Sequence, residues 1–112
     1  MRKIDITPEC SNFIESQDRR VIEKFYQLVQ ILIEVKVVHS NFVKKIQKTH
    51  FFELRIKAGN EYRVLLFAID HLNFAECESA ILLNGFQKKS TKDYKKAIKE
   101  ADKLLKEYLK DN

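Results

Sequence analysis

The 112-residue sequence contains no tryptophan, one proline and two glycines, so regular secondary structure is expected to dominate and loops to be short. Its two cysteines, Cys10 and Cys77, lie far apart, and neither has metal-ligand spacing to another cysteine or to a histidine. The beginning of the chain carries no apolar run, and no apolar stretch is long enough to span a membrane. We therefore expect a cytoplasmic protein whose reduced thiols are small buried or half-buried side chains.

Several patterns of known chemistry are also missing from the sequence. It contains no HxxE, CxxC, glycine-rich phosphate loop or paired-carboxylate arrangement, so neither a metal ion nor another cofactor is indicated. Its three histidines, His39, His50 and His71, fall in expected loops or turns. A histidine base would be chemically attractive, and His50 directly precedes an expected strand, but exposure to solvent is the favoured interpretation.

Positive charge is plentiful and unevenly distributed along the chain. The formal net charge is +5. Residues 82–99 hold six lysines against one aspartate, and residues 44–63 hold six basic residues against two glutamates. Localised positive charge is typical of a surface that binds a polyanion, but a solvated lysine surface accounts for these counts equally well.

Hydrophobic periodicity predicts a short strand and two helices in the first third of the chain. Residues 3–6 suit a strand, and Thr7-Pro8 supplies a capping hydroxyl and a proline for a helix that runs to about Glu15. A longer helix is expected from near Asp18. Its apolar positions recur at spacings of three and four: Val21, Phe25, Leu28, Leu32 and Val35. Residues 36–50 are expected to form a connector.

Three more strands and a final helix are expected in the rest of a single domain over residues 1–112. Two strand-forming segments within residues 51–70 flank Ala58-Gly59-Asn60, in which Gly59-Asn60 suits a tight reversal. The second of these strands, residues 62–69, is apolar on both faces and should be central. Another strand is expected over residues 76–86. Ser90 and Asp93 resemble a capping box before a helix with an apolar stripe of Tyr94, Ala97, Ile98, Ala101, Leu104, Leu105 and Tyr108. The order β-α-α-β-β-β-α predicts an α+β fold, an antiparallel sheet with two N-terminal helices and one C-terminal helix packed on it.

Basic side chains are expected to share one face of this sheet. Arg55 and Lys57 are two residues apart in a strand and therefore point the same way. Across a close hairpin Arg63 can reach the side of Arg55, and Lys88 and Lys89 leave the end of the next strand beside it. Like charges gathered in this way repel one another, which favours a site for an anion such as phosphate, a ligand that arginine binds with two donors.

Ordinary ion pairs are the alternative explanation for these cations. Arg55 could pair with Glu53 or Glu61, and Arg63 with Glu78, in cross-strand salt bridges. Both interpretations fit the alternation of the strands.

Short motifs in this part of the sequence resemble a known family. They are FELRI at residues 52–56, EYRVL at residues 61–65 and GFQKKS at residues 85–90, preceded by VKKI at residues 43–46 and followed by a helix that contains Ala101. In order and spacing, over roughly residues 3–109, the sequence resembles the phage-derived HigB branch of the RelE/ParE toxin superfamily. The resemblance implies a RelE-like fold and the toxin half of a type II toxin–antitoxin pair.

Toxins of this kind are usually ribosome-dependent mRNA endoribonucleases, in which a ribose 2′-hydroxyl attacks the adjacent phosphate without a metal ion. The resemblance therefore implies inhibition of translation and growth. It also implies three kinds of partner: a helix-turn-helix antitoxin of the HigA type, the ribosome with its mRNA, and operator DNA that is bound only through the antitoxin.

The resemblance also implies residue roles, one position at a time. Arg63 matches the arginine of the YR pair and is the strongest candidate to stabilise the scissile phosphate. Arg55 and Lys57 would hold RNA or assist the base step, and Lys88 would contact phosphate or donate a proton. Tyr94 lies where some relatives place a functional tyrosine, although the HigB branch more often has proline there. The catalytic candidates are Arg63, Arg55, Lys88 and Tyr94, and the RNA-binding candidates are Lys57, Lys89, Lys92, Lys44 and Lys45.

Two other functions are compatible with the same motifs. ParE-type relatives act on DNA gyrase through protein contacts, and a phage accessory protein could bind nucleic acid without cutting it. The GFQKK segment and the density of sheet-facing cations favour RNA as the target. Packing is the favoured role for Tyr108, whereas packing and chemistry are equally weighted for Tyr94.

Overall fold

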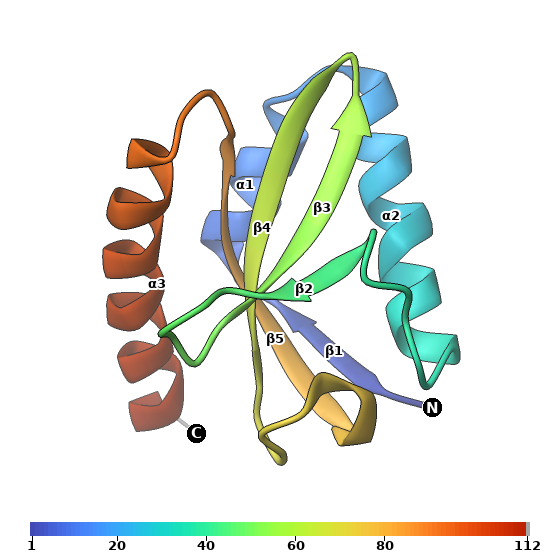
Figure 1. Ribbon diagram of the computed structural model, residues 1–112, viewed down its shortest axis with the longest axis vertical. Coiled ribbons are helices and arrows are strands. Elements are labelled where there is room, and N and C mark those ends of the chain that lie inside the picture. The colour runs from blue at the N-terminus through green and yellow to red at the C-terminus, as the bar shows by residue number, and fades with distance from the viewer. Residues whose placement is uncertain (112) are drawn as a thin grey trace.

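In a computed structural model, residues 1–111 form a five-stranded sheet with three α-helices packed on it (Figure 1). The elements follow one another as β1 (Lys3–Ile6), α1 (Pro8–Glu15), α2 (Arg19–Glu34), β2 (Val43–Lys45), β3 (Phe52–Ala58), β4 (Asn60–Ala68), a 3₁₀ helix η1 (Phe74–Glu76), β5 (Ser79–Gln87) and α3 (Lys92–Asp111). The predicted α+β class and the order of its main elements are confirmed. The short strand β2 is additional, because it lies in the segment predicted to be a connector.

The strands lie side by side in the order β1-β5-β4-β3-β2, which places β4 in the centre as predicted. Strands β2 to β5 pair with antiparallel neighbours, as hairpin connections require. Strand β1 pairs with β5 in parallel, so the sheet is mixed rather than wholly antiparallel. The hairpin rule that predicts antiparallel pairing does not apply to β1, because two helices and three strands separate it from β5 along the chain.

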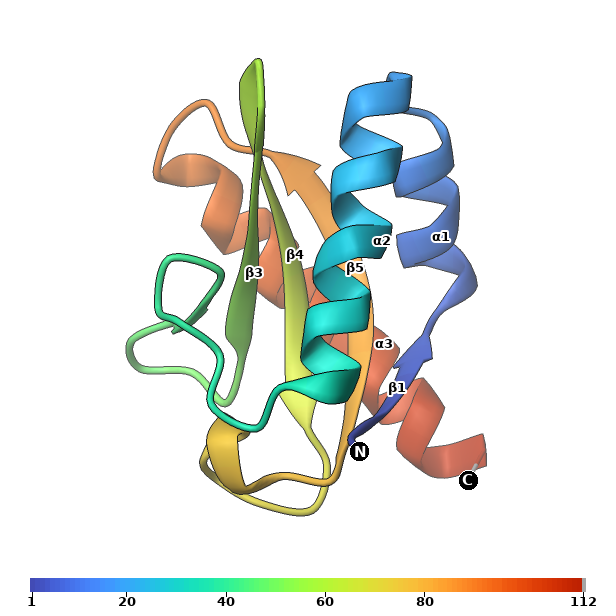
Figure 2. The same ribbon diagram turned by 90° about the vertical axis from the view of Figure 1, so that its right-hand side faces the viewer.

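The two sides of the sheet have separate hydrophobic cores. Helices α1 and α2 pack on one side and α3 packs on the other (Figure 2). The residues of the predicted stripe that lie in α2 are buried against the first side, together with Leu54 and Ile56 of β3, whereas Val35 follows the end of the helix and is exposed. The second core joins Ala97, Ala101, Leu104 and Leu105 of α3 to the sheet. Within residues 1–111 no helix is both long and apolar enough to cross a membrane.

The helices begin at the predicted caps. The Thr7 hydroxyl accepts a hydrogen bond from the Cys10 backbone N–H, and the Asp18 carboxylate accepts bonds from two N–H groups of α2. Before α3, the Asp93 carboxylate accepts bonds from the N–H groups of Lys89 and Ser90, which is the acidic half of the predicted capping box. These bonds lower the pKa of Asp93. The helix starts therefore follow from local sequence.

Both cysteines are free and buried, which confirms the expectation of structural thiols. Burial raises the pKa of Cys10 to about 12 and also raises the pKa of Cys77. Because the thiolate is the reactive form, neither side chain is suited to nucleophilic chemistry.

A bulge in β5 sets which face its final residues present. The register with β4 shifts by one residue between Leu65 and Leu66, which leaves Leu83 as the extra residue. Since side chains alternate between the two faces of a sheet, one extra residue reverses the alternation beyond that point. Phe86 consequently packs on the α3 side of the sheet, and Lys88 follows on the same side, near Tyr94.

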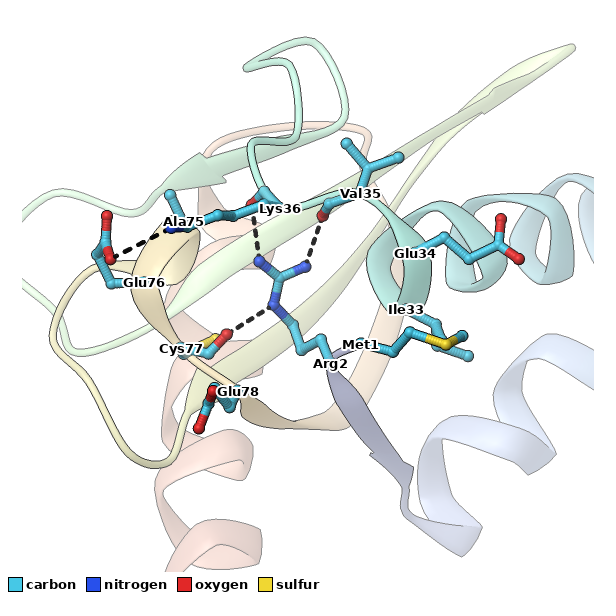
Figure 3. A pocket seen from close by; sticks show the side chains of 10 residues that line it. All are labelled: Met1, Arg2, Ile33, Glu34, Val35, Lys36, Ala75, Glu76, Cys77 and Glu78. Carbon is cyan, nitrogen blue, oxygen red and sulfur yellow. Dashed lines mark hydrogen bonds and ion pairs between the residues drawn. The ribbon is translucent and has the colours of Figure 1, made fainter.

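Arg2 joins the beginning of the chain to two distant segments. Its side chain is buried, and its guanidinium donates to the carbonyls at the end of α2 and around η1 (Figure 3). The acceptors of its five N–H groups are the carbonyl oxygens of Leu32, Val35, Lys36, Phe74 and Cys77. The guanidinium also stacks 4.2 Å from the centroid of the Phe74 ring. A positive charge at the carboxyl end of a helix is electrostatically favourable, so Arg2 both caps α2 and fixes β1 beside it.

Replacing Arg2 by methionine should destabilise the fold by about 3 kcal/mol or more, because five carbonyls lose a charged donor in a buried setting. Urea unfolding followed by circular dichroism measures this change. The matched control is Arg19→Met, whose side chain is exposed in an i,i+4 ion pair and should have little effect. Equal unfolding midpoints for Arg2→Met and the wild type would contradict the capping role.

Candidate nucleic-acid interface

The catalytic candidates meet where the β3–β4 hairpin approaches the beginning of α3. Arg55 and Arg63 are direct partners in the antiparallel ladder and lie on the α3 side of the sheet. Lys57 lies two residues after Arg55 in β3 and therefore points to the same side of the sheet. The hydroxyl oxygen of Tyr94, in the first turns of α3, accepts a hydrogen bond from Arg63 Nε, and Lys88 Nζ lies 5.9 Å from the centroid of the Tyr94 ring. The structure therefore brings Arg55, Arg63, Lys88 and Tyr94 together.

Arg63 is the centre of this cluster and is only 1% exposed. Its Nη2 donates to Glu61 Oε1 at 2.8 Å, its Nη1 to the carbonyl of Tyr62 at 3.1 Å, and its Nε to the Tyr94 hydroxyl at 3.0 Å. Glu53 Oε1 lies 3.3 Å from the same Nε. Arg63 therefore has two carboxylate partners within the chain, Glu53 and Glu61, and the pairing of Arg63 with Glu78 that the sequence left open is wrong.

Glu53 is the carboxylate that holds the two arginines together. Its side chain is 8% exposed, and its Oε1 lies 3.2 Å from Arg55 Nε as well as 3.3 Å from Arg63 Nε. The pairing of Arg55 with Glu53 is the ion-pair alternative that the sequence left open. The alternation of residues 53, 55 and 57 in β3 already places Glu53 on the cationic face, but only the structure shows that it also bonds across the hairpin.

The cluster keeps an excess of positive charge after these pairs are counted. Arg55, Lys57, Arg63 and Lys88 are four cations against the two carboxylates of Glu53 and Glu61, which leaves 4 − 2 = +2. Within residues 1–111 no carboxylate lies in ion-pair distance of Lys57 or Lys88. The positive charge open to an external anion is therefore carried mainly by the lysines and by the partly exposed Arg55, whose side chain is 32% exposed.

Tyr94 combines the packing role and the chemical role that the sequence left equally weighted. Its ring packs edge-on against Phe86, with centroids 5.1 Å apart and an interplanar angle of 79°. Burial and a hydrogen bond with Glu53 raise the pKa of Tyr94, whereas Arg63 acts in the opposite direction. The hydroxyl is therefore protonated at neutral pH and is chemically suited to donate a proton rather than to accept one. For Tyr108 packing is confirmed: it lies against the α3-side core, and its hydroxyl donates to Asp5.

The remaining candidates divide between the two faces of the sheet. Lys89 and Lys92 are exposed at the beginning of α3, next to the cluster. Lys44 pairs with Glu53 in the register of β2 and β3 and shares its face. Lys45 pairs with Phe52, on the opposite face, and its Nζ lies 5.9 Å from that ring, so the structure does not bring Lys45 to the cluster.

Other possible reactive groups lie outside the cluster. His39, His50 and His71 are all exposed, in agreement with the favoured interpretation, and none contacts the arginines. Among residues 1–111, no three side chains of histidine, cysteine, aspartate or glutamate are grouped so that they could hold a metal ion. The chemistry available at the cluster is therefore that of guanidinium, ammonium, carboxylate and phenol groups.

Comparison with known proteins places these motifs in a family. The sequence profile described as "Phage derived protein Gp49-like (DUF891)" matches residues 12–106, which include β2 to β5 and most of α3. The chain belongs to this Gp49-like family. No curated protein matches the sequence of this Gp49-like protein significantly.

Solved structures of E. coli RelE share the fold of the Gp49-like protein. A chain of the intact RelBE toxin–antitoxin complex superposes with a TM-score of 0.56 at 15% identity, covering 80% of this chain and 100% of that one. A free RelE variant with two arginines replaced by alanine gives 0.58 at 14% identity, covering 88% and 95%. The isolated RelE toxin gives 0.55 at 15% identity, covering 88% and 97%. The predicted RelE-like fold is confirmed.

Replacing Glu53 by glutamine should loosen the cluster, because Arg63 then loses one of its two anionic partners. We expect a loss of about 2 kcal/mol or more in unfolding free energy, since Glu53 is buried between charges. We also expect the pKa of Tyr94 to fall, because Glu53 raises it and Arg63 lowers it. Denaturant unfolding and ultraviolet titration of tyrosine, with Tyr94→Phe as the assignment control, measure these two changes.

The charge-matched control is Glu78→Gln, which removes an exposed carboxylate away from the cluster and should change neither quantity. An unaltered Tyr94 titration in Glu53→Gln would show that the carboxylate does not act on the phenol.

Proposed function

We propose that this Gp49-like protein is the toxin of a type II toxin–antitoxin system and a metal-independent, ribosome-dependent mRNA endoribonuclease. The observation that supports it most is the joint position of Arg55, Arg63, Lys88 and Tyr94 on one side of the sheet, in a cluster that, with Lys57, Glu53 and Glu61 included, has a net charge of +2. The exposed lysines at the beginning of α3 extend this positive surface, as a phosphate backbone requires. The RelE-like fold adds support by analogy.

The proposed reaction is an internal transesterification of the RNA. The ribose 2′-hydroxyl attacks the adjacent phosphorus, its proton leaves to a base, and the bond to the 5′-oxygen breaks to give a cyclic phosphate and a 5′-hydroxyl. Arg63 stabilises the charge that develops on the phosphorane, and Arg55 with Lys57 holds the RNA. Lys88 contacts the phosphate, and Tyr94, which stays protonated at neutral pH, donates a proton to the leaving oxygen.

The proposed partners follow from the same function. The matched RelE chain belongs to a toxin–antitoxin complex, and by analogy this protein binds a cognate antitoxin, which we propose to be a helix-turn-helix protein of the HigA type. The ribosome presents the mRNA, and operator DNA is bound through the antitoxin. The exposed lysines Lys89, Lys92 and Lys44 are proposed to contact RNA.

Lys88→Ala should lower mRNA cleavage at least about tenfold in a cell-free translation system and should relieve growth arrest, because one phosphate-stabilising charge is lost. This variant is a sharper test than Arg63→Ala, since Arg63 is buried and its removal would leave the buried Glu53 with Arg55 as its remaining ion-pair partner. The matched control is Lys103→Ala, which removes an exposed lysine of α3 outside the cluster. Unchanged translation together with inhibited gyrase supercoiling by the wild type would favour the ParE-type function instead.

Binding to single-stranded RNA should weaken steeply as salt increases. If about four to six phosphates are contacted, the slope of log K against log salt concentration should be about −3 to −4. Fluorescence anisotropy with a 2′-O-methyl oligonucleotide, which cannot undergo 2′-hydroxyl attack, measures binding without cleavage. A slope near zero would indicate that the positive surface meets a protein rather than a nucleic acid.

A further inference from the structure

The Glu61 carboxylate lies where the cations of the cluster converge. Its Oε1 is 2.8 Å from Arg63 Nη2. Lys57 is its direct partner across the hairpin, and the backbone N–H of Lys88 donates to the Glu61 carbonyl at 2.8 Å. The hydrogen bond and charge of Arg63 lower the pKa of Glu61, and the charges of Lys88 and Lys57 lower it further. An anion at this point therefore interacts with cations from three successive strands or their ends.

The two carboxylates on Arg63 differ in how freely they can leave. The Glu53 side chain is 8% exposed and is held between two arginines, whereas the Glu61 side chain is 50% exposed and bonds only Arg63 among the described residues. Water can solvate the Glu61 carboxylate when it leaves, because half of its side chain is already exposed, whereas the enclosed Arg63 guanidinium depends on the protein for a counter-ion. Glu61 can therefore turn into solvent while Glu53 keeps Arg63 in position.

We propose that the Glu61 carboxylate occupies a phosphate-binding site and can be displaced from it. A phosphodiester would replace this carboxylate on Arg63 Nη2, between Lys57 and Lys88. That the ligand is RNA rests on the proposed function, whereas the phosphate-binding site is inferred from the geometry of the cluster. Exchange of one monoanion for another keeps the charge of Arg63 balanced throughout. The observed affinity for phosphate then depends on how much more strongly Arg63 binds phosphate than it binds the Glu61 carboxylate. This affinity should rise when the Glu61 carboxylate is removed.

Glu61→Gln should bind a 2′-O-methyl RNA oligonucleotide about two- to fivefold more tightly than the wild type, because a competing carboxylate that is half-exposed, and therefore held weakly, is lost. Glu100→Gln supplies the charge-matched control, because it removes an exposed carboxylate from α3 that makes no ion pair in the described chain. It should change the affinity by less than about 1.5-fold at physiological salt, where a distant exposed charge is screened. Fluorescence anisotropy measures all three proteins.

Inorganic phosphate provides a second measurement that does not depend on RNA cleavage. At equal ionic strength, replacing chloride by phosphate should raise the Tm of Glu61→Gln more than the Tm of the wild type or of Glu100→Gln. If Glu61→Gln binds both the 2′-O-methyl RNA and inorganic phosphate no more tightly than the wild type, the proposed phosphate-binding site is wrong, even if the wild type cleaves mRNA. If phosphate raises the Tm of Glu61→Gln more than that of the wild type, but no variant binds or cleaves RNA, the phosphate-binding site is supported and the proposed function is wrong.

Discussion

The pairing of two arginines across β3 and β4 is the constraint on which the rest of the site depends. Arg55 and Arg63 face each other in an antiparallel ladder, where like charges repel. Glu53 offsets that repulsion, because one of its oxygens lies 3.2 Å from Arg55 Nε and 3.3 Å from Arg63 Nε. In this buried setting the attraction is stronger than it would be in water. Arg63 can therefore remain enclosed and hold the hydroxyl of Tyr94.

Much of the fold was accessible from the sequence because the signals are local. The caps at Thr7 and Asp18 depend on residues that are neighbours along the chain, and the stripe of α2 repeats within one helix. The central place of β4 follows from its apolar residues on both faces. The shared face of Arg55 and Arg63 follows from strand alternation and a close hairpin, and Gly59, with a φ of 77°, provides the positive value that this reversal needs.

The features that could not be predicted depend on contacts between distant segments. Gly85 is a local sign of irregularity in β5, but it does not say which residue is extra, and without the bulge Phe86 and Lys88 would face α1 rather than Tyr94. The acceptors of Arg2 lie at least 30 residues away along the chain, so its burial has no local signature. Composition and motifs therefore identified the cationic candidates. Their carboxylate partners, and the arrangement of these groups around Arg63, are seen only in the three-dimensional structure of the sheet.

A buried arginine without an anion is not a stable arrangement for a free protein, because an uncompensated buried charge costs about 3–5 kcal/mol. Under the proposed function, a fold that positions Arg63 in advance of a phosphate must therefore supply anions of its own, and Glu53 and Glu61 are anions in that position. A phosphate site built on a buried arginine should therefore not be recognised in the free protein by unpaired cations. The more informative feature is a carboxylate of the protein that pairs with the arginine and is exposed enough to be displaced. Glu61, exposed near the tip of the hairpin, meets this condition, and Glu53 does not.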